Sequence, residues 1–328
     1  NLDKDLILEK IRQGKEFLYR MENQEKHGFY KKYDVLNDSF EERLYTPYSA
    51  SIIYTFLYIY DLEKDYNPPS ASSHSSLRSE WAPEEILEHI PAWGDFLLSM
   101  QNKDKEDKAY GAFSYSFYLD KNEKEKRFVV GTSALSIFTL LRLYELTGDS
   151  RYLESAKLAG DWLATMQNPD GSMKAYLKYS DGEWTYGTKL SLLYNGQVLS
   201  GLSKLYRVTN DKKYYDVAQG IAELFAEKYE KEKGYIEGEY RKKNPISNSW
   251  VVMSLMDFYK ANQDERYKKI VFELSEKILA NQKNNEDDFL YYGGWGGAYS
   301  SSGVGWISEV MAETYRFCQE ERGDDCDK

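Results

Sequence analysis

The chain has 328 residues, and its 43 Lys and Arg against 54 Asp and Glu give a formal net charge of −11. This negative balance disfavours nucleic acid and anionic membranes as partners, and no apolar run reaches the roughly 18 to 20 residues that span a bilayer. The first residues, Asn1–Asp5, are polar rather than a signal peptide, so the protein is either cytoplasmic or has lost a leader. We favour the second case, a secreted or extracytoplasmic protein.

The composition gives little support to metal or cofactor chemistry. The three histidines, His27, His74 and His89, are isolated from one another, which leaves almost no material for a zinc site or a Ser-His-Asp triad. Cys318 and Cys326 have neither His nor further Cys beside them. They either close a small disulfide loop, as export would allow, or are two free thiols near the chain end. We expect no metal and no cofactor.

A recurring phrase gives the chain its periodicity. The segment Leu143–Tyr152 returns in changed form as Leu205–Tyr214 and as Phe258–Tyr267, and weaker copies surround Tyr60 and Tyr315. Apart from one enlarged step, the shared Tyr recurs every 53 to 62 residues. A repeat of this length fits a pair of helices and a loop. The sequence therefore predicts stacked helical hairpins.

Each hairpin begins with a predicted outer helix that has one apolar face. In Tyr152–Met166, for example, apolar residues follow the three-and-four spacing of a half-buried helix. Asp149, Asp211 and Asp264 precede such stretches and are placed to cap them. In chain order, the outer helices are predicted over Leu6–Met21, Ile86–Met100, Tyr152–Met166, Val217–Tyr229 and Ile270–Leu279.

Each hairpin ends with a predicted inner helix that is apolar or small on nearly every side, which indicates burial all round. In chain order, the inner helices are predicted over Pro47–Tyr60, Gly131–Tyr144, Leu190–Tyr206, Ser247–Tyr259 and Gly303–Phe317. A long loop rich in Gly and aromatic residues precedes each inner helix. Alternating segments in these loops, such as Gly111–Phe117, predict small β-hairpins.

Five or six such hairpins arranged about an axis make an all-α fold, an α/α toroid, with small β-hairpins in the loops at one end. Inner helices then line the centre, and we expect function at the end where the long loops emerge. We predict a single toroid domain over residues 1–328. The Ser/Pro-rich segment 67–80 is predicted to be a surface insertion at the opposite end.

The alternation of helices, the turn Gln167–Ser172 and the phrase Leu-Tyr-x-x-Thr-x-Asp resemble the α/α-toroid superfamily. That group holds six-hairpin glycosidase-like enzymes, toroid polysaccharide lyases, uronyl epimerases and terpenoid cyclases. The chain has no Asp-rich cyclase motif, so a terpenoid role is not favoured. The resemblance implies an enzyme with a carbohydrate substrate, without identifying the sugar.

We favour a glycoside hydrolase-like enzyme that cleaves glycosidic bonds of a poly- or oligosaccharide. Hydrolysis needs two carboxyl groups, one protonated and one ionised. Glu309 stands in an otherwise apolar inner helix, where an unpaired carboxylate is costly. It either pairs with Arg43 or Arg316, or faces the central cavity with a raised pKa. The candidate catalytic carboxyl groups, in order of preference, are Glu309, Glu42, Asp288 and Glu239.

A uronate-specific polysaccharide lyase or epimerase is the first alternative. It needs a base for the C5 proton, an acid that Tyr often supplies, and a cation or amide that neutralises the sugar carboxylate. The residues proposed for this set are Arg43, Tyr45, Tyr48, Tyr186, Tyr194, Tyr299, Asn195 and Asn248.

Tryptophans are the main sign of carbohydrate binding. Trp184, Trp250, Trp295 and Trp306 fall in the loops or early turns of inner helices, at the same predicted end. Their rings suit the flat, partly apolar faces of sugars. We therefore predict an aromatic-lined central cleft that binds substrate. A non-catalytic toroid that binds glycans or a protein partner is the second alternative.

Overall fold

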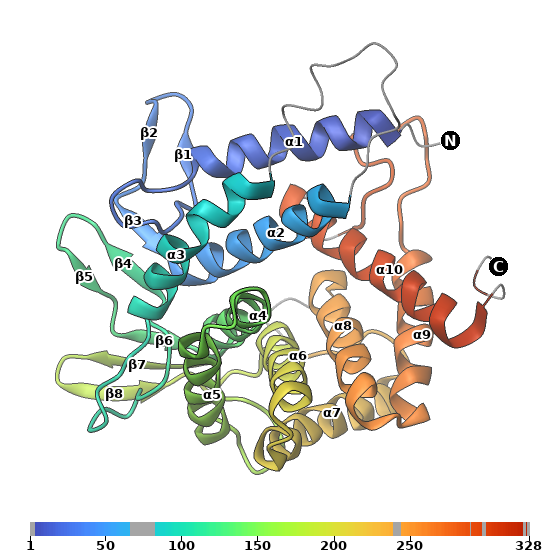
Figure 1. Cartoon of the computed structure of the whole chain (residues 1–328). Helices are drawn as coiled ribbons and strands as arrows, with labels where there is room; N and C mark the ends of the chain where they lie inside the picture. The colour runs from blue at the N-terminus through green and yellow to red at the C-terminus, as the bar shows by residue number, and fades with distance from the viewer. Residues whose placement is uncertain are drawn as a thin grey trace. The chain divides into compact units, whose positions relative to one another are not determined.

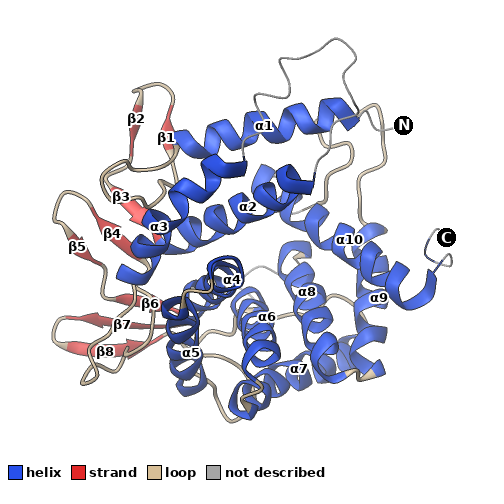
Figure 2. Ribbon diagram, viewed as in Figure 1, coloured by secondary structure: helices blue, strands red, loops and turns tan. Residues whose placement is uncertain are grey.

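The computed structural model describes residues 4–65, 83–238, 244–288, 290–296, 300–323 and 326. These residues form mostly helices, with short strands between some of them (Figure 2). Contacts divide the chain into two compact units: unit 1 is Asn1–Ala159 with Lys178–Asp181, and unit 2 is Gly160–Leu177 with Gly182–Lys328. The predicted insertion at 67–80 lies outside the described residues.

Unit 1 begins with two helical hairpins and the first part of a third (Figure 1). The inner helix α2 packs against α1, α3 and the second inner helix α4. The Thr139 hydroxyl of α4 donates a hydrogen bond to the Ala50 carbonyl of α2, at 2.7 Å. The helices are α1 (Lys4–Arg20), α2 (Thr46–Asp65), α3 (Pro83–Ser99), α4 (Val130–Thr147) and α5 (Ser150–Thr165), the last of which ends in unit 2.

The strands of unit 1 lie beside the ends of α1 and α3 and the start of α2 (Figure 2). β1 (Tyr33–Asp34) and β2 (Ser39–Phe40) form an antiparallel pair. β3 (Arg43–Tyr45), β4 (Ser116–Tyr118) and β5 (Glu123–Lys124) form a sheet in that order, and β6 is Arg127–Val129. The small β-hairpins predicted in the loops are therefore present, and β3 leads directly into α2.

Unit 2 consists mainly of α6 to α10, in which the inner helix α8 packs against α6, α9 and α10. Gly196 allows α6 to approach α8 closely, because a Cβ there would lie only 2.8 Å from the Trp250 carbonyl oxygen. The elements are β7 (Tyr176–Ser180), β8 (Glu183–Tyr186), α6 (Leu192–Thr209), α7 (Lys212–Glu232), α8 (Pro245–Asn262), α9 (Glu265–Leu279) and α10 (Ser301–Arg322). Part of β7 belongs to unit 1.

The predicted aspartate caps are confirmed. Asp211 and Asp264 each stand at the N-cap and accept a hydrogen bond from the backbone N–H two residues on, at 3.1 and 2.9 Å. Asp149 accepts the equivalent bond from Arg151, at 2.9 Å. The repeated phrase is thus a helix end, a turn and a capped helix start.

Four inner helices hold the preceding loop in the same way, through the side chain of their fourth residue. Ser or Asn at this position accepts a hydrogen bond from a loop N–H that is otherwise buried without a partner. The pairs are Phe29 to Ser49 (2.9 Å), Phe113 to Ser133 (3.1 Å), Met173 to Asn195 (2.9 Å) and Ile236 to Asn248 (2.8 Å). We call these four side chains the loop anchors.

In two hairpins, a glutamine at the end of the outer helix bonds both the loop that follows it and the next outer helix. The Gln101 amide donates to the Gly111 and Ser155 carbonyls, both at 2.9 Å. The Gln167 amide likewise donates to the Gly171 and Val217 carbonyls, at 3.1 and 2.8 Å. Each amide therefore bridges its own loop and a neighbouring hairpin.

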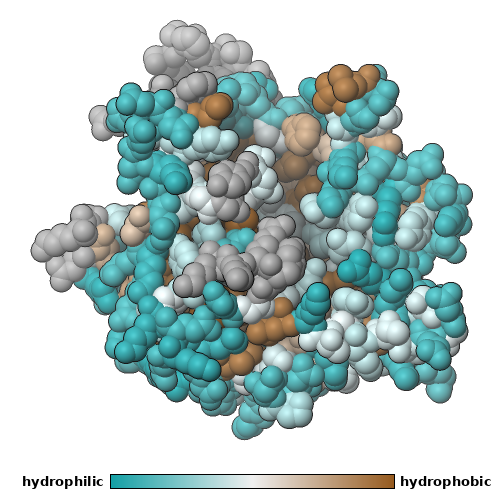
Figure 3. Space-filling model, turned by 180° about the vertical axis from the view of Figure 1, so that it is seen from behind, coloured by the Kyte–Doolittle hydropathy of each residue, from teal (hydrophilic) through white to brown (hydrophobic). Residues whose placement is uncertain are grey.

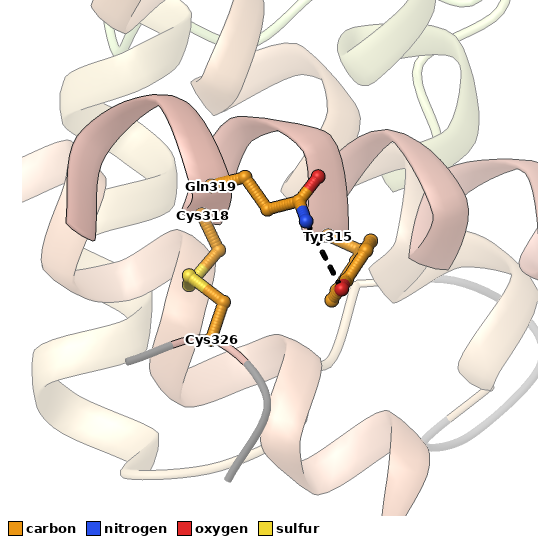
Figure 4. The surroundings of a disulfide bond; sticks show 4 residues. All are labelled: Tyr315, Cys318, Gln319 and Cys326. Atoms are coloured by element: carbon orange, nitrogen blue, oxygen red, sulfur yellow. Dashed lines mark hydrogen bonds between the residues drawn. A yellow bond between two sulfur atoms is a disulfide. The ribbon is translucent and has the colours of Figure 1, made fainter. Parts of the chain in front are cut away.

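The two cysteines form a disulfide at the end of α10. Cys318 and Cys326 are joined with an S–S distance of 2.06 Å (Figure 4). Nearby, the Gln319 side chain donates a hydrogen bond to the Tyr315 hydroxyl at 3.0 Å. Of the two alternatives left open by the sequence, the bonded one is observed.

The surface drawn in Figure 3 is predominantly hydrophilic. Among the described helices, none combines the length and the apolar character needed to cross a bilayer.

Candidate functional site

Unit 1 carries a cluster of tyrosines and cations where β3 joins α2. Tyr45 ends β3 and Tyr48 lies in the first turn of α2, and their rings meet edge to face with centroids 5.9 Å apart. Lys31 places its Nζ 5.3 Å from the Tyr45 centroid and 5.1 Å from the Tyr48 centroid. Tyr115 adds a second edge-to-face contact with Tyr45, at 5.7 Å. With Arg43, these residues form what we call the tyrosine-cation cluster.

Arg43 is held rigidly on one side of the cluster. Its Nε donates to the Ser116 hydroxyl at 2.7 Å, and its guanidinium forms an ion pair with Glu125. The guanidinium carbon also lies 4.8 Å from the Tyr45 ring centroid and 4.5 Å from that of Tyr118. Since Glu125 partly neutralises Arg43, Lys31 is the cation of the cluster without a carboxylate partner among the described residues.

The electrostatics keep Tyr45 protonated and Lys31 charged. Burial raises the pKa of Tyr45; Glu41 acts in the same direction, whereas Arg43 and Lys31 oppose it. Burial acts to lower the pKa of Lys31, but its interactions with the hydroxyls of Tyr48, Tyr115 and Tyr45 outweigh this effect and raise it. The cluster therefore combines a proton-donating phenol with a positive charge.

Glu41, which was not selected from the sequence, reaches the cluster. It accepts a hydrogen bond from the Tyr45 hydroxyl at 3.3 Å, and its other carboxyl oxygen is buried without a hydrogen-bond partner in the described part of the chain. Glu42, which was selected, has an exposed side chain. Glu41 lies two residues before β3, and the chain bends at Glu42 between them. Its position beside Glu42, just before Arg43 and Tyr45, is the sequence signal that could have identified it.

Unit 2 carries a pair of stacked tryptophans near Glu309, the preferred catalytic candidate from the sequence. Trp250 of α8 and Trp306 of α10 stack with ring centroids 3.9 Å apart and an interplanar angle of 17°. Trp250 is buried and Trp306 half-buried, and the indole nitrogen of Trp306 has no hydrogen-bond partner among the described residues. Glu309 follows Trp306 by one turn of α10, so the two side chains share a face of that helix.

Glu309 has an exposed side chain whose carboxyl is nevertheless desolvated by the surrounding protein. This desolvation, together with the negative charge of Glu313, raises the pKa of Glu309. The two cations predicted to pair with it have other partners: Arg316 bonds Glu313 at 2.6 Å and Arg43 bonds Glu125. A raised pKa is what an acid catalyst requires.

Three predicted substrate-binding residues are buried and make hydrogen bonds within the protein. Asn195 and Asn248 are fully buried loop anchors, and their amide groups also donate to the backbone carbonyls of Ser191 (2.7 Å) and Asn244 (3.0 Å). Trp295 is 5% exposed and donates its indole N–H to the Ile278 carbonyl at 2.9 Å. Because these polar groups are engaged inside the protein, contact with a sugar would require local rearrangement.

The remaining predicted residues are more dispersed. Tyr186 is exposed, with Lys174 Nζ 5.0 Å from its ring centroid, and Trp184 is half-buried on β8. Asp288 is exposed in the loop before α10. Glu239 and Tyr299 lie outside the described residues. Glu42 belongs to unit 1 and Glu309 to unit 2, so their action as a catalytic pair stays a prediction.

Metal ligation finds no support in the described residues, where no group of three or more His, Cys, Asp or Glu side chains is arranged to hold an ion.

A family model, the ulvan lyase N-terminal domain, matches residues 90–291, which is more than half of the chain. Comparison with curated protein sequences gives no significant match.

Solved structures of carbohydrate enzymes share the fold at low identity. Cellobiose 2-epimerase from Bacillus thermoamylovorans is 16% identical with a TM-score of 0.72, covering 98% of this chain and 84% of that one. An unsaturated glucuronyl hydrolase specific for heparin is 12% identical with a TM-score of 0.60, covering 96% and 98%. A family 76 glycoside hydrolase (mannosidase) from Bacteroides thetaiotaomicron is 15% identical with a TM-score of 0.59, covering 85% and 72%. The predicted α/α-toroid fold and the resemblance to that superfamily are confirmed.

Proposed function

The chain belongs to the ulvan lyase N-terminal domain family, and we propose that it is a carbohydrate-active enzyme that cleaves a uronate-containing polysaccharide by β-elimination. Support comes from the family and from the fold, which the chain shares with an epimerase and two glycoside-cleaving hydrolases. It also comes from the tyrosine-cation cluster, because lyase chemistry needs a positive charge and proton-transferring groups at one place.

The observation that carries this proposal is the position of Lys31. Its ammonium group faces the rings of both Tyr45 and Tyr48, at 5.3 and 5.1 Å from their centroids. A uronate carboxylate bound by Lys31 would therefore lie beside both phenols. Neutralising that carboxylate makes the neighbouring C5 proton easier to remove, because negative charge develops there in the transition state.

The cluster supplies a role for each tyrosine in the elimination. Tyr48, acting as its phenolate, accepts the C5 proton and becomes a phenol. The electron pair of the C5–H bond forms the C4=C5 double bond, and the C4–O4 bond breaks. Tyr45 then donates its proton to the leaving O4. The raised pKa of Tyr45 suits this second role, since the phenol is protonated at neutral pH. Glu41 orients the Tyr45 hydroxyl through its hydrogen bond.

The reaction type can be tested directly on uronate and neutral polysaccharides. β-Elimination produces a double bond conjugated to the carboxylate, and hence ultraviolet absorbance, together with one new reducing end for each cut. We expect both signals with a uronate polymer and neither with a neutral one. New reducing ends without absorbance would rule out the lyase and indicate hydrolysis.

The alternative reaction is hydrolysis, which the sequence alone favoured. It is favoured by the raised pKa of Glu309 and by the Trp250–Trp306 stack one turn away. Substitutions separate the two reactions: Glu309→Gln abolishes hydrolysis and spares elimination, whereas Tyr45→Phe has the opposite effect. Loss of absorbance-forming activity only in Glu309→Gln would contradict the assignment of the cluster.

We also propose that the protein works outside the cytoplasm. The Cys318–Cys326 disulfide supports this location, because disulfides persist mainly in oxidising compartments. Thiol labelling of the native protein, taken from its own cells without reductant, should modify neither cysteine.

A further inference from the structure

Unit 1 contains a groove between α3 and α5 that the proposed chemistry does not use. Its volume is about 930 Å³, within the range of roughly 300–1,000 Å³ that small-molecule sites occupy. Leu98, Phe128 and Leu158 contribute apolar surface, and charged side chains from the loop after α3, from β5 and from α5 line the rest. Apolar surface bordered by polar groups suits a sugar ring, which has apolar faces and hydroxyls at its edge.

Most acids of the groove are already engaged. Asp95 pairs with Arg151 at 3.1 Å, and Glu125 pairs with Arg43. Asp104 and Asp107 each accept a hydrogen bond from a backbone N–H of their own loop, at 3.1 and 2.8 Å. The ion pairs neutralise Asp95 and Glu125. The charges of Asp104, Asp107 and Glu154 are matched in number by Lys103, Lys124 and Lys126, so the lining is close to neutral.

Three lysines line the groove, Lys103, Lys124 and Lys126, and the first two repel each other. Among the residues that the structure describes, Lys103 and Lys124 form no ion pair, and Lys124 Nζ donates instead to the Ser99 carbonyl. Burial and the positive charge of Lys103 lower the pKa of Lys124, which shows that the ammonium is partly desolvated and repelled by its neighbour. An anion placed beside both lysines would relieve this repulsion.

We propose that this groove is a second sugar-binding site, which takes an acidic sugar residue of the polysaccharide and binds its carboxylate through Lys103 and Lys124. The choice of ligand rests on the proposed function. Glu125 connects the two places, because it lines the groove and also pairs with Arg43 of the tyrosine-cation cluster. The groove and the cluster are therefore neighbours, so one polymer chain can reach both.

The test compares two double variants that remove the same charge. Lys103→Gln with Lys124→Gln neutralises the groove, whereas Lys105→Gln with Lys108→Gln neutralises two exposed lysines of the same loop region that do not line it. Both pairs are made in a Tyr45→Phe background, so that the ligand is not consumed. Calorimetry then measures binding of a glucuronate-containing hexasaccharide and of a neutral hexasaccharide of equal length.

We expect the groove variant to bind the acidic hexasaccharide about tenfold more weakly, the usual scale for loss of charge-assisted contacts, and the control within twofold of its parent. Affinity for the neutral ligand should not differ between the variants. An equal loss in both variants would assign the effect to net charge and overturn the proposal, as would no loss in either. A groove-specific loss in a protein without lyase activity would uphold the site while rejecting the proposed reaction.

Discussion

The tyrosine-cation cluster of unit 1 and the tryptophan pair of unit 2 occupy comparable places on similar hairpins but offer different chemistry. In both, aromatic side chains lie within the first two turns of inner helices: Tyr48 on α2, Trp250 on α8 and Trp306 on α10. Unit 1 places Lys31 and Arg43 against its rings, whereas unit 2 places Glu309 one turn from its stack. The difference indicates that the repeated scaffold fixes where a site forms, and the residues around the aromatic rings decide which charge it carries.

The largest expected effect is on catalytic activity, and it tests whether the proton donor lies in the cluster of unit 1 or in unit 2. Tyr45→Phe removes the phenol hydroxyl that we assign to the leaving group, and kcat should fall by about 10²- to 10⁴-fold with little change in KM. Tyr33→Phe is the matched control, since it removes a hydroxyl from the nearby β1 strand, where that group bonds Asp38. Comparable losses in the two variants would mean that the loop, rather than the phenol of Tyr45, governs activity.

The next effect tests the charge that distinguishes unit 1. Lys31→Met keeps most of the side-chain length but removes the ammonium group, and kcat/KM on a uronate polymer should fall by about 10- to 100-fold, as expected for loss of a charged hydrogen bond. Lys32→Met removes the same charge from the neighbouring exposed position and should change kcat/KM less than twofold. If both lysines matter equally, attraction by net charge explains the result instead of a specific contact.

In unit 2 we expect a smaller effect, on stability. Trp306→Ala removes the half-buried partner of Trp250, and the free energy of unfolding should fall by about 2 kcal/mol, measured by urea denaturation. Trp306→Phe, which retains a ring for stacking, should recover part of this loss. Unchanged stability combined with weaker oligosaccharide binding would instead make the tryptophan pair a sugar platform and strengthen the hydrolase alternative.

The smallest effect is the pH dependence contributed by Glu309. Because the folded protein raises the pKa of Glu309, it binds more protons at this site than the unfolded chain does between the two pKa values. Stability from this group is therefore complete below the ordinary glutamate pKa and is lost as pH rises through the raised value. Glu309→Gln should remove that loss. The unfolding free energy of the variant, relative to that of the wild type, should therefore increase as pH rises across this window. A difference in unfolding free energy that does not vary with pH would contradict the raised pKa.

The helical hairpins were predictable because their signals are local. Helical spacing in Tyr152–Met166 and the caps Asp211 and Asp264 depend on residues within one or two turns of each other. The outcome for Asn195 and Asn248 was not predictable, since each side chain bonds a loop N–H many residues earlier. Sequence patterns do not specify such partners, so a buried anchor and a substrate-binding amide look alike.

The candidate-site residues also differ in this way: some are visible in the nearby sequence, and others depend on contacts between distant segments. The acidic pair Glu41 and Glu42 beside Arg43 and Tyr45 was visible in the local sequence, although the sequence did not show which carboxylate bonds Tyr45. In contrast, the stacking of Trp250 on Trp306 and the pairing of Arg43 with Glu125 join distant parts of the chain. Lys31 was not selected at all, because only the fold brings its loop to Tyr45 and Tyr48.

In the second and third hairpins, the bonds of Gln101 and Gln167 and the loop anchors divide the loop into a fixed and a variable part. In the second hairpin, Gln101 and Ser133 pin the chain at Gly111 and Phe113, and the β4–β5 hairpin lies beyond these points. In the third, Gln167 and Asn195 pin it at Gly171 and Met173. Segments beyond the pinned residues can therefore be lengthened, shortened or exchanged without disturbing helix packing, which makes them natural sites for grafting new specificity onto this scaffold.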